Sequence, residues 1–447
     1  MQAKSPALLK LRHTPPPHNV LRNSTLANNH WFHSQAKNNK LRIKKALIVT
    51  KLTRYDFEKI RAPELNAIEL EDCIRGRGTD FDALMHYHHL HKTTENKVID
   101  AFRKKGIEVK IVNRLTINKK LLQWCDVLVP VGGDGTFLLA ASRASPLFIE
   151  HSVPIIGFNS DPQRSEGRLM LPKQYSVDVN DAVKKLLTGE FSWMHRSRLR
   201  ITLLGCNGHA PVPIDLHEYN PAPVEHKEFI ISEPTLIDQI NGNGNGKKKT
   251  KRLLPYLALN EVFIGETLSA RVSHLHIRPS TTQKITKTKS SGLCVSTGTG
   301  STSWHTSINR LSNKNVEDLL NILKGNSLDL AGVNPGSISE EYNRRLVFEP
   351  DDPRLCYSIR EQICVGVWPN PKDFESRDFS QNLYVKSRCI DASKSKWTES
   401  QSIAFLSLAI LGLVIDGTIA YPFNDGTKAM LEVLPEDALL TMQLNEN

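Results

Sequence analysis

A strand that runs through a glycine turn into a helix constrains the fold of this chain more than any other stretch. In residues 124–142, WCDVLVPVGGDGTFLLAAS, an apolar run leads into two glycines, then Asp134, then another glycine. The apolar residues that follow have helical spacing. A buried strand that turns directly into a helix is typical of a parallel α/β sheet. We therefore predict that Asp134 lies on a turn at the end of a buried strand.

The glycines of this turn predict contact with phosphate groups. The backbone N–H groups of Gly132, Gly133 and Gly135 can approach an anion closely, and the helix that follows adds the positive end of its dipole. The spacing matches neither the G-x-x-x-x-G-K-[ST] phosphate loop nor the G-x-G-x-x-G dinucleotide fingerprint. An oxidoreductase is therefore a poor interpretation.

Asp134 is the unusual residue of the turn, because a carboxylate among phosphate-binding amides would repel a bare anion. Its presence makes sense if it handles a proton, a Mg²⁺ ion or both. Transfer of a phosphoryl group to a hydroxyl needs a base near the acceptor oxygen. The alternative is an ordinary type I′ turn, in which Asp-Gly is common. The change from strand to helix favours the functional interpretation.

The pattern along the chain predicts two domains. In residues 43–195, apolar strands alternate with helical segments, as in a parallel α/β sheet. In residues 196–435, short β-like runs separated by turn residues predict a mostly β domain. The expected elements of the first domain are strands at 41–51, 106–112, 121–129 and 153–159 and a helix at 93–105.

Three segments stand outside this pattern. Residues 220–252 contain NGNGNGKKKTKR, whose composition predicts a flexible insertion. Residues 313–345 look helical around NVEDLLNILKG. We expect residues 436–447 to be a C-terminal tail.

The excess positive charge lies at the N-terminus. The net charge is +11, and residues 1–55 hold eleven Lys or Arg and no Asp or Glu. The rest of the chain is neutral, whereas a nucleic-acid-binding domain needs basic charge on its folded surface, so we expect no nucleic-acid partner. Residues 1–42 are predicted to be a mitochondrial transit peptide. A disordered basic tail is the alternative, because Pro15, Pro16 and Pro17 break any long helix.

Histidines and cysteines fit a metal site poorly. His86, His88, His89 and His91 of HYHHLH do not share one helical face, so a solvated polar helix end is the better interpretation. The seven cysteines include no C-x-x-C pair. With no secretory signal visible, we expect them to be reduced and to bind no structural metal.

Two further stretches combine polar side chains with apolar surroundings. In LALNEVFIG, 257–265, Asn260 and Glu261 lie inside a hydrophobic strand, where unpaired polar groups cost about 1–3 kcal/mol each. A ligand or mutual hydrogen bonds must satisfy them, unless they face solvent on an edge strand. In STGTGSTSW, 296–304, hydroxyls and amides can surround a polar ligand, and Trp304 offers a stacking face. A plain Ser/Thr-rich loop is the alternative.

Together these motifs resemble those of the NAD kinase family. GGDGT, an Asn-Glu pair before IG, the TGSTSW turn and a late DG occur in that family's order, and the resemblance covers about residues 43–435. The mitochondrial branch is the most similar. Segments that resemble this branch are TKLTRYDFEK (50–59), FNSDPQRSEGRL (158–169), PVPIDLHE (211–218), KSSGL (289–293), SINR (307–310), SIRE (358–361) and FNDG (423–426).

The resemblance implies ATP-dependent phosphorylation of the 2′-hydroxyl of the adenosine ribose of NAD, which gives NADP. It also implies Mg²⁺, a Rossmann-like N-terminal domain and a β-sandwich-like C-terminal domain, with the site in the cleft between them. A homodimer is expected, with no membrane partner. The expected location is the mitochondrial matrix, with the cytoplasm as the alternative.

The resemblance assigns roles to individual residues. Asp134 is the expected general base on the ribose hydroxyl, and Gly132, Gly133 and Gly135 shape the phosphate turn. Asn260 and Glu261 are expected to hold the adenosine part of NAD. No residue is assigned as a direct ligand of Mg²⁺. The other expected NAD contacts are Asn159, Thr302, Ser303, Trp304 and Ser307, with Lys289 and Asp416 as further candidates.

Two departures from the family pattern support the branch assignment. The commoner turn has proline where Gly298 stands, and bacterial members have aspartate where Ser291 stands, two positions after Lys289. The mitochondrial branch shows the same changes. A diacylglycerol- or sphingosine-type lipid kinase is one alternative, but it should lack the Asn-Glu strand and the TGTGSTSW turn. A non-catalytic dinucleotide-binding protein is another, and it would tolerate loss of Asp134.

Residues 394–413 interrupt the resemblance just before VIDGT (414–418). Their apolar run, which extends from Ile403 to Ile415, is too short to span a bilayer, which takes about 20 residues. A surface loop would not carry it, and a close-packed core has no spare volume for it. We expect the segment to be a translated intron or a poorly packed excursion, and not a functional part of the protein.

Overall fold

The computed structural model describes most of the chain. Residues 1–41 of the expected N-terminal tail and residues 394–410 of the interrupting segment lie outside the described part. The described residues are 42–145, 152–204, 213–216, 235–241, 248–268, 270–282, 284–325, 330, 332–364, 374–389 and 411–444.

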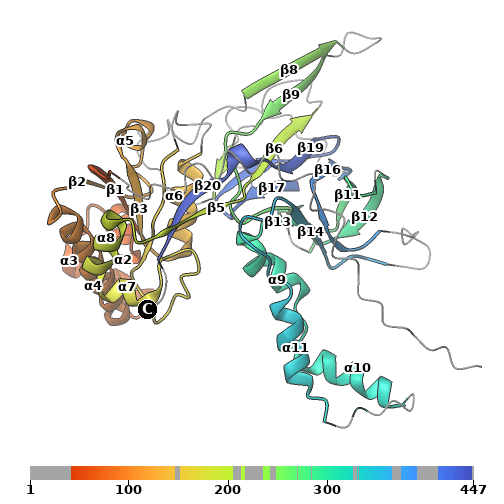
Figure 1. The fold of residues 1–447 in the computed structure, drawn as a ribbon, viewed down its shortest axis with the longest axis horizontal. Coiled ribbons are helices and arrows are strands. Elements are labelled where there is room, and N and C mark those ends of the chain that lie inside the picture. Colours follow the sequence, from red (N-terminus) through yellow and green to blue (C-terminus); the bar gives the residue numbers. More distant parts are fainter. Residues whose placement is uncertain are drawn as a thin grey trace, which may run out of the picture.

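A parallel four-stranded sheet forms the N-terminal part, in the order β2-β1-β3-β4 (Figure 1). Each strand of the central pair is buried on both faces, as in other parallel sheets. The strands are β1 (Lys45–Thr50), β2 (Glu108–Val112), β3 (Val127–Gly132) and β4 (Phe158–Asn159).

Helices cover both faces of this sheet. Ala46 and Ile48 of β1 pack in one hydrophobic cluster with residues of α4 and α8. Leu47 and Val49 pack in the other, with residues of α5 and α6. The helices are α2 (Arg54–Arg61), α3 (Ala67–Gly76), α4 (Phe81–Arg103), α5 (Lys119–Trp124), α6 (Asp134–Arg143), α7 (Lys173–Val177) and α8 (Val179–Thr188).

Three elements of this part differ from expectation. Residues 121–124 of the strand predicted at 121–129 belong to helix α5, and the strand itself is β3. The helix predicted at 93–105 begins at Phe81, where the side chain of Asp80 accepts a hydrogen bond from the N–H of Ala83 at 3.0 Å. The polar sequence HYHHLH lies within α4 and hides the helical period. The strand predicted at 153–159 shortens to β4, with isolated bridges at Ile155.

Two antiparallel seven-stranded sheets form the rest, which confirms the expected mostly β region. The first has the order β15-β14-β13-β10-β17-β18-β7 and the second β12-β11-β16-β19-β6-β9-β8. The strands of the first are β7 (Ile214–Asp215), β10 (Glu261–Glu266), β13 (Gly292–Ser296), β14 (Leu355–Arg360), β15 (Arg377–Ser380), β17 (Leu411–Ile415) and β18 (Ile419–Pro422). Those of the second are β6 (Leu199–Leu204), β8 (Thr235–Asn241), β9 (Lys248–Leu253), β11 (Ser273–Pro279), β12 (Thr286–Ser290), β16 (Asn382–Ser387) and β19 (Lys428–Val433).

One hydrophobic cluster joins the two sheets and the α/β part. It contains Val262 and Leu293 of the first sheet and Ile277 and Leu431 of the second. It also contains Phe137 of α6. Because apolar burial is the main favourable term in folding, this shared cluster fixes α6 against the β-rich part.

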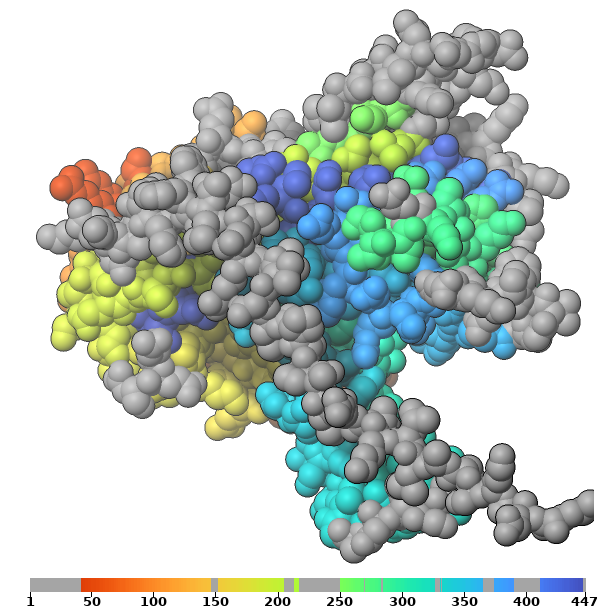
Figure 2. All heavy atoms as spheres, turned by 45° about the vertical axis from the view of Figure 1, so that its right-hand side comes forward, coloured from red at the N-terminus to blue at the C-terminus, as the bar shows by residue number. Residues whose placement is uncertain are grey.

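Two pairs of elements project from this body. Helices α10 (Asn313–Gly325) and α11 (Pro335–Arg344) pack on each other and extend away from the sheets (Figure 1, Figure 2). The β8–β9 hairpin projects from the far end of the second sheet (Figure 1). This hairpin lies largely within the predicted flexible insertion at 220–252.

The prediction of a C-terminal tail is wrong. β20 (Leu439–Gln443) pairs with β5 (Ser192–Arg196), and Thr441 forms a parallel bridge to Ile155. Leu439 and Met442 are buried. The chain therefore returns to the α/β part, and the apolar residues of LLTMQ are the sequence signal for this strand.

The prediction for residues 394–413 is wrong at its end. Residues 411–413 belong to β17, which lies between β10 and β18 in the first sheet, and Leu411 and Leu413 are fully buried. The apolar run thus ends in a central strand of an antiparallel sheet, in which every residue except Val414 is buried. Among the described residues, no helix combines the length and the apolar character that crossing a bilayer requires.

Candidate functional site

A cleft of about 600 Å³ opens at the carboxyl ends of β1 and β3. In the sheet order β2-β1-β3-β4, the chain leaves β1 to form β2 on one side of it and then crosses over to form β3 on the other side. The crevice between β1 and β3 is therefore the topological switch point at which open α/β sheets bind ligands. The lining residues are Thr50, Lys51, Leu52, Arg114, Gly132, Gly133, Asp134, Gly135, Thr136, Leu138, Leu139, Asn159, Ser160, Asp161, Arg164, Ser165, Asp416, Gly417 and Thr418.

The glycine turn presents bare backbone to this cleft. Gly132 ends β3, and a Cβ there would overlap with the side chain of Thr136. Gly133 is the N-cap of α6, and its Cβ would lie 3.1 Å from Oγ of Ser165. A Cβ on Gly135 would meet nothing within 4 Å. The open space therefore lies at Gly135, in the first turn of α6, and space beside a helix N-terminus suits a phosphate group.

Asp134 is the first residue of α6, and two backbone hydrogen bonds fix its carboxylate. Oδ1 accepts from the N–H of Leu169 at 2.9 Å, and Oδ2 accepts from the N–H of Arg168 at 3.1 Å. These bonds join the first turn of α6 to the loop that follows β4. The carboxylate is therefore held in one orientation at the cleft.

Asn159 shapes the same loop. Its Nδ2 donates to the carbonyl oxygen of Ser165 at 3.0 Å, and its Oδ1 accepts from the N–H of Asp161 at 3.0 Å. A Cβ on Gly167, whose φ is +63°, would overlap with the Asn159 amide. The side-chain amide of Asn159, which was expected to contact NAD, therefore forms its hydrogen bonds within the loop that holds Asp134.

Asp416 joins the cleft to the start of β10. Asn260 lies in the bend just before this strand and Glu261 is its first residue, so the two residues lie at the beginning of the predicted strand and not inside it. Its Oδ1 accepts from the N–H groups of Asn260 and Glu261, at 2.8 and 3.0 Å, and its Oδ2 from the N–H of Leu259 at 2.8 Å. Burial raises the pKa of Asp416 to about 6, although the three N–H bonds lower it. Its φ of +48° lies in the left-handed region that favours glycine. A strained residue with its carboxylate satisfied in this way favours a functional position.

The side chains of Asn260 and Glu261 retain unused polar atoms. Nδ2 of Asn260 donates to Oγ of Ser303 at 3.1 Å. Oδ1 of Asn260 and Oε2 of Glu261 are buried and have no hydrogen-bond partner among the described residues. Burial, together with the charge of Asp416, raises the pKa of Glu261 to about 8. Buried polar atoms without partners are costly, so both side chains fit a polar ligand.

The turn at 297–303 packs against the same strand. A Cβ on Gly300 would overlap with the carbonyl oxygen of Asn260, and the N–H of Thr297 donates to that oxygen at 3.0 Å. The turn continues through η2 (Thr299–Thr302) into α9 (Trp304–Asn309). The segment that begins at Thr297 therefore lies against Asn260 at its start, and it continues through Thr302, Ser303, Trp304 and Ser307.

The structure explains why glycine stands at position 298. A Cβ on Gly298 would overlap with the carbonyl oxygen of Glu349. The segment around Glu349 follows α11 and donates the N–H of Phe348 to Oγ of Ser301 at 3.3 Å. A proline at position 298 would collide with this segment.

Two buried arginines, which the sequence analysis missed, connect the two parts of the chain. Arg196 donates to Oγ1 of Thr299 at 3.3 Å, and burial lowers its pKa to about 10, against the charge of Asp134. Arg198 is buried between the end of α6 and the C-terminal segment, where its Nε donates to the carbonyl oxygen of Asp437 at 2.5 Å. The alternation RSRLR predicts exposed charges on a strand, so the local pattern does not reveal these burials.

Three cations line the cleft and were not identified from the sequence. They are Lys51, Arg114 and Arg164. Burial lowers the pKa of Arg114, whose guanidinium lies 5.2 Å from the ring centre of Phe57. Arg164 lies 3.7 Å from the ring centre of Tyr87. Positive charge around a glycine turn attracts phosphate groups.

The expected site residues fall into three groups. The cleft collects Gly132, Gly133, Asp134, Gly135, Asn159 and Asp416. Asp416 accepts hydrogen bonds from the N–H groups of Asn260 and Glu261, and Asn260 donates to Ser303. The cleft lining does not include Asn260, Glu261, Thr302, Ser303, Trp304 or Ser307. Lys289 lies on β12 of the second sheet and is not among the residues that line the cleft.

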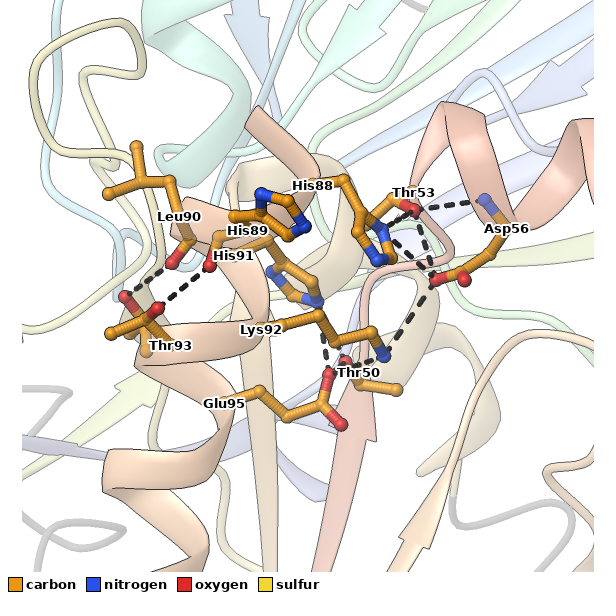
Figure 3. Close-up of polar contacts among 11 residues, drawn as sticks. Thr50, Thr53, Asp56, His88, His89, Leu90, His91, Lys92, Thr93 and Glu95 are labelled. Carbon is orange, nitrogen blue, oxygen red and sulfur yellow. Dashed lines mark hydrogen bonds and ion pairs between the residues drawn. The ribbon is translucent and has the colours of Figure 1, made fainter. Parts of the chain in front are cut away.

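The expectation of a solvated polar helix end at HYHHLH is wrong for two of its histidines. The side chains of His91 and His88 are only 4% and 13% exposed, and both bind threonines at the end of β1 (Figure 3). The two residues lie three positions apart on α4 and so face the sheet together. The described residues contain no group of three or more His, Cys, Asp and Glu side chains that could hold a metal ion.

Known proteins with similar sequences include two from different organisms that carry the same name. The chain is 37% identical over 407 residues to human "NAD kinase 2, mitochondrial", covering 90% of this chain and 84% of the human protein. It is 34% identical over 421 residues to the protein of the same name from Xenopus tropicalis, covering 89% and 90%. A solved structure of yeast NADH kinase complexed with NADH aligns with a TM-score of 0.44 and 13% identity, covering 91% and 84%. No family model matches the chain.

Proposed function

The chain belongs to the mitochondrial NAD kinase family, and we propose that it transfers the γ-phosphoryl group of ATP to the 2′-hydroxyl of the adenosine ribose of NAD. Membership makes it a phosphotransferase that phosphorylates NAD in mitochondria. The observation that carries the proposed chemistry is the carboxylate of Asp134, fixed by two backbone N–H groups at the mouth of a glycine turn.

Asp134 acts as the general base in this proposal. It accepts the proton of the ribose hydroxyl as the hydroxyl oxygen attacks the γ-phosphorus. The N-terminus of α6 and the cations of the cleft stabilise the charge on the phosphate oxygens. The fixed orientation of the carboxylate supports the role, because a base must lie within hydrogen-bond reach of its proton.

Mg²⁺ fits this cleft through the chemistry of its donors. Mg²⁺ prefers carboxylate oxygens, water and phosphate oxygens, and it is usually held by one or two carboxylates together with substrate phosphates. Asp134 and Asp161 are the carboxylates near the glycine turn that line the cleft. When bound, the ion would neutralise charge on the phosphates of ATP.

In this proposal the dinucleotide contacts Asn260 and Glu261, whose N–H groups bind Asp416, and the turn at 297–303. The unpaired Oδ1 of Asn260 accepts hydrogen bonds from ribose hydroxyls or base amines, and so does Oε2 of Glu261 when that group is ionised. Ser303 keeps the Asn260 amide in place through its hydroxyl. These atoms support the proposal because each is buried and lacks a partner among the described residues.

Trp304 is expected to act on NAD and not on ATP. Its side chain is 46% exposed, and its ring centre lies 5.6 Å from that of Phe263. The guanidinium of Arg360 lies over this ring, 5.5 Å from its centre, so a base would stack on the part of the ring that remains exposed. We expect Trp304→Ala to raise the KM for NAD about tenfold and to change the KM for ATP less than twofold. Steady-state kinetics of one variant measure both constants, and equal changes would mean that Trp304 only packs.

The reaction itself is tested with the purified full-length protein. With ATP, Mg²⁺ and NAD we expect NADP and ADP in equal amounts. With diacylglycerol or sphingosine in place of NAD we expect no phosphorylated product, whereas a lipid kinase would form one. Binding of NAD without NADP formation would instead favour a non-catalytic dinucleotide-binding protein.

We also propose that residues 1–42 are a mitochondrial transit peptide and that the enzyme is a homodimer. The first rests on the acid-free basic N-terminus, and the second on the family resemblance. A fusion of residues 1–50 to a fluorescent reporter is expected to enter mitochondria, and a protein that starts at residue 41 is expected to retain full activity. A reporter that stays in the cytosol would reject the first proposal, and light scattering that gives a monomer mass would reject the second.

A further inference from the structure

Two residues of α4 hold the last residue of β1 (Figure 3). Oγ1 of Thr50 lies 2.9 Å from Nε2 of His91 and donates to Oε2 of Glu95 at 2.6 Å. All three residues are buried. His91 and Glu95 are four positions apart on the helix, so both side chains reach the same point of the strand.

A second group of the same kind holds the loop that follows β1. Oγ1 of Thr53 lies 2.8 Å from Nδ1 of His88 and donates to Oδ2 of Asp56 at 2.9 Å. Lys92 joins the two groups, because its Nζ lies 3.0 Å from Oε2 of Glu95 and 3.7 Å from Oδ2 of Asp56. The loop after β1 is therefore attached to α4 at both ends.

The direction of each hydrogen bond follows from the available protons. Burial by itself would raise the pKa of Glu95, but hydrogen bonds from His91, Thr50 and Lys92 outweigh it and lower the pKa to about 2. The carboxylate can only accept, so the single hydroxyl hydrogen of Thr50 goes to Glu95. Nε2 of His91 must then donate, and it lies 2.9 Å from the threonine oxygen and 3.3 Å from Oε2 of Glu95, so its hydrogen is directed at both acceptors. A nucleophilic hydroxyl would need an imidazole that accepts its proton, so this group is not one; it fixes position.

Lys51 is the residue that this arrangement positions in the cleft. Its N–H donates to the carbonyl oxygen of Val131 at 3.0 Å, and its Cβ lies 3.1 Å from the place where a Cβ of Gly132 would be. Its side chain is exposed and lines the cleft. The backbone of Lys51 thus lies directly beside the glycine turn. It is held by its hydrogen bond to Val131 and by the contacts of Thr50 and Thr53 with α4.

Lys51 is also the least engaged cation of the cleft. Arg114 lies over the ring of Phe57, and Arg164 lies over the ring of Tyr87. The ammonium of Lys51 has no hydrogen bond or ion pair within the described part of the chain. A lysine binds phosphate as a mobile point charge, so its usefulness depends on where its backbone is held.

We propose that His91 and Glu95, acting through Thr50, are positioning residues that hold the ammonium of Lys51 beside the glycine turn, where it binds the phosphate groups of the donor nucleotide. The inference rests on the proposed function, in which that nucleotide is ATP. The N–H groups of the turn and the ammonium then meet the same phosphates from two sides.

Steady-state kinetics and MgATP binding test this with four variants and one control. We expect Lys51→Met to raise the KM for ATP about tenfold, since it removes a charge-assisted hydrogen bond, with the KM for NAD and kcat within about twofold. We expect His91→Ala to do the same. His91→Gln carries an amide N–H near the position of Nε2 and should restore the KM for ATP. In the double variant His91→Ala/Lys51→Met, the KM for ATP should not exceed that of Lys51→Met alone.

The control is Lys105→Met, which removes an exposed lysine that follows α4 and does not line the cleft; it should leave every constant unchanged. If His91→Ala is recovered unfolded, Thr50→Val takes its place, because valine keeps the β-branched shape in the strand and removes only the hydroxyl. Calorimetric Kd values for MgATP should follow the same order, and they do not depend on turnover.

Three results would overturn the inference. They are an unchanged ATP affinity in Lys51→Met, an equal loss of ATP and NAD affinity in His91→Ala, and additive losses in the double variant. Each of these leaves NADP formation by the unchanged protein intact. Failure of the unchanged protein to form NADP would instead reject the proposed function, while the MgATP affinities would still decide the role of Lys51.

Discussion

Replacement of Asp134 by asparagine is expected to lower kcat at least about 100-fold, because it removes the base that accepts the ribose proton. Asparagine keeps the size of the side chain and one acceptor oxygen. The N–H groups of Arg168 and Leu169 now each bind one carboxylate oxygen, at 3.1 and 2.9 Å, so one of them loses its acceptor. We therefore also expect a small loss of thermal stability, with the KM for NAD within about threefold.

Asp181→Asn is the matched control for this experiment. Asp181 is also an acidic residue in the first turn of a helix, α8, and it pairs with Lys185 at 3.3 Å away from the cleft. Its kcat should stay within about twofold of that of the unchanged protein. Near-normal turnover in Asp134→Asn would sink the assignment of the base.

The second large effect is expected in how the free energy of unfolding depends on pH, because Glu261 titrates differently in the folded and unfolded protein. The pKa of Glu261 is raised to about 8 by burial and by the charge of Asp416, whereas an exposed glutamate titrates near 4.3. The folded protein therefore binds a proton more tightly than the unfolded chain in this window. This stabilisation is fully present below about pH 4 and is lost as the pH rises through about 8.

Glu261→Gln should remove this dependence while it keeps the shape of the side chain. At pH 9, where the unchanged protein carries a buried charge, we expect the variant to be more stable by about 3 kcal/mol. At pH 5 the two proteins should be nearly equal. Urea unfolding at both pH values measures the difference, and a variant that is less stable at pH 9 would contradict the raised pKa. Glu266→Gln, on the same strand, is the control.

Local patterns were sufficient for some elements and misleading for others. The strand–turn–helix unit around Asp134 was predictable because the apolar run, the glycines and the helical spacing all lie within 124–142. Helix α4 was placed too late in the chain, because HYHHLH looks polar and gives no period. Only Thr50, the last residue of β1, and Thr53, in the loop that follows it, show which histidines of α4 face inward.

Residues whose roles depend on contacts between distant segments were not predictable from the sequence. Arg196 and Arg198 lie in an alternating sequence that is typical of an exposed strand, yet both are buried where the two parts of the chain meet. Lys51 follows an apolar strand, as many surface lysines do. Its place beside Gly132 depends on the parallel pairing of β1 with β3.

The sequence by itself determined the α/β unit with its glycine turn, the β-rich second part, the order of the family motifs and Asp134 as the candidate base. These depend on residues that are near one another in the chain, where periodicity and turn chemistry act. Only the tertiary structure decided that Asp416 binds the backbone of Asn260 from 156 residues away. It also decided that the C-terminus forms a strand beside β5 and that the end of an apolar run is a central strand. Such contacts arise from the packing of whole elements, which lowers the free energy through burial and hydrogen bonding between segments that share no local pattern.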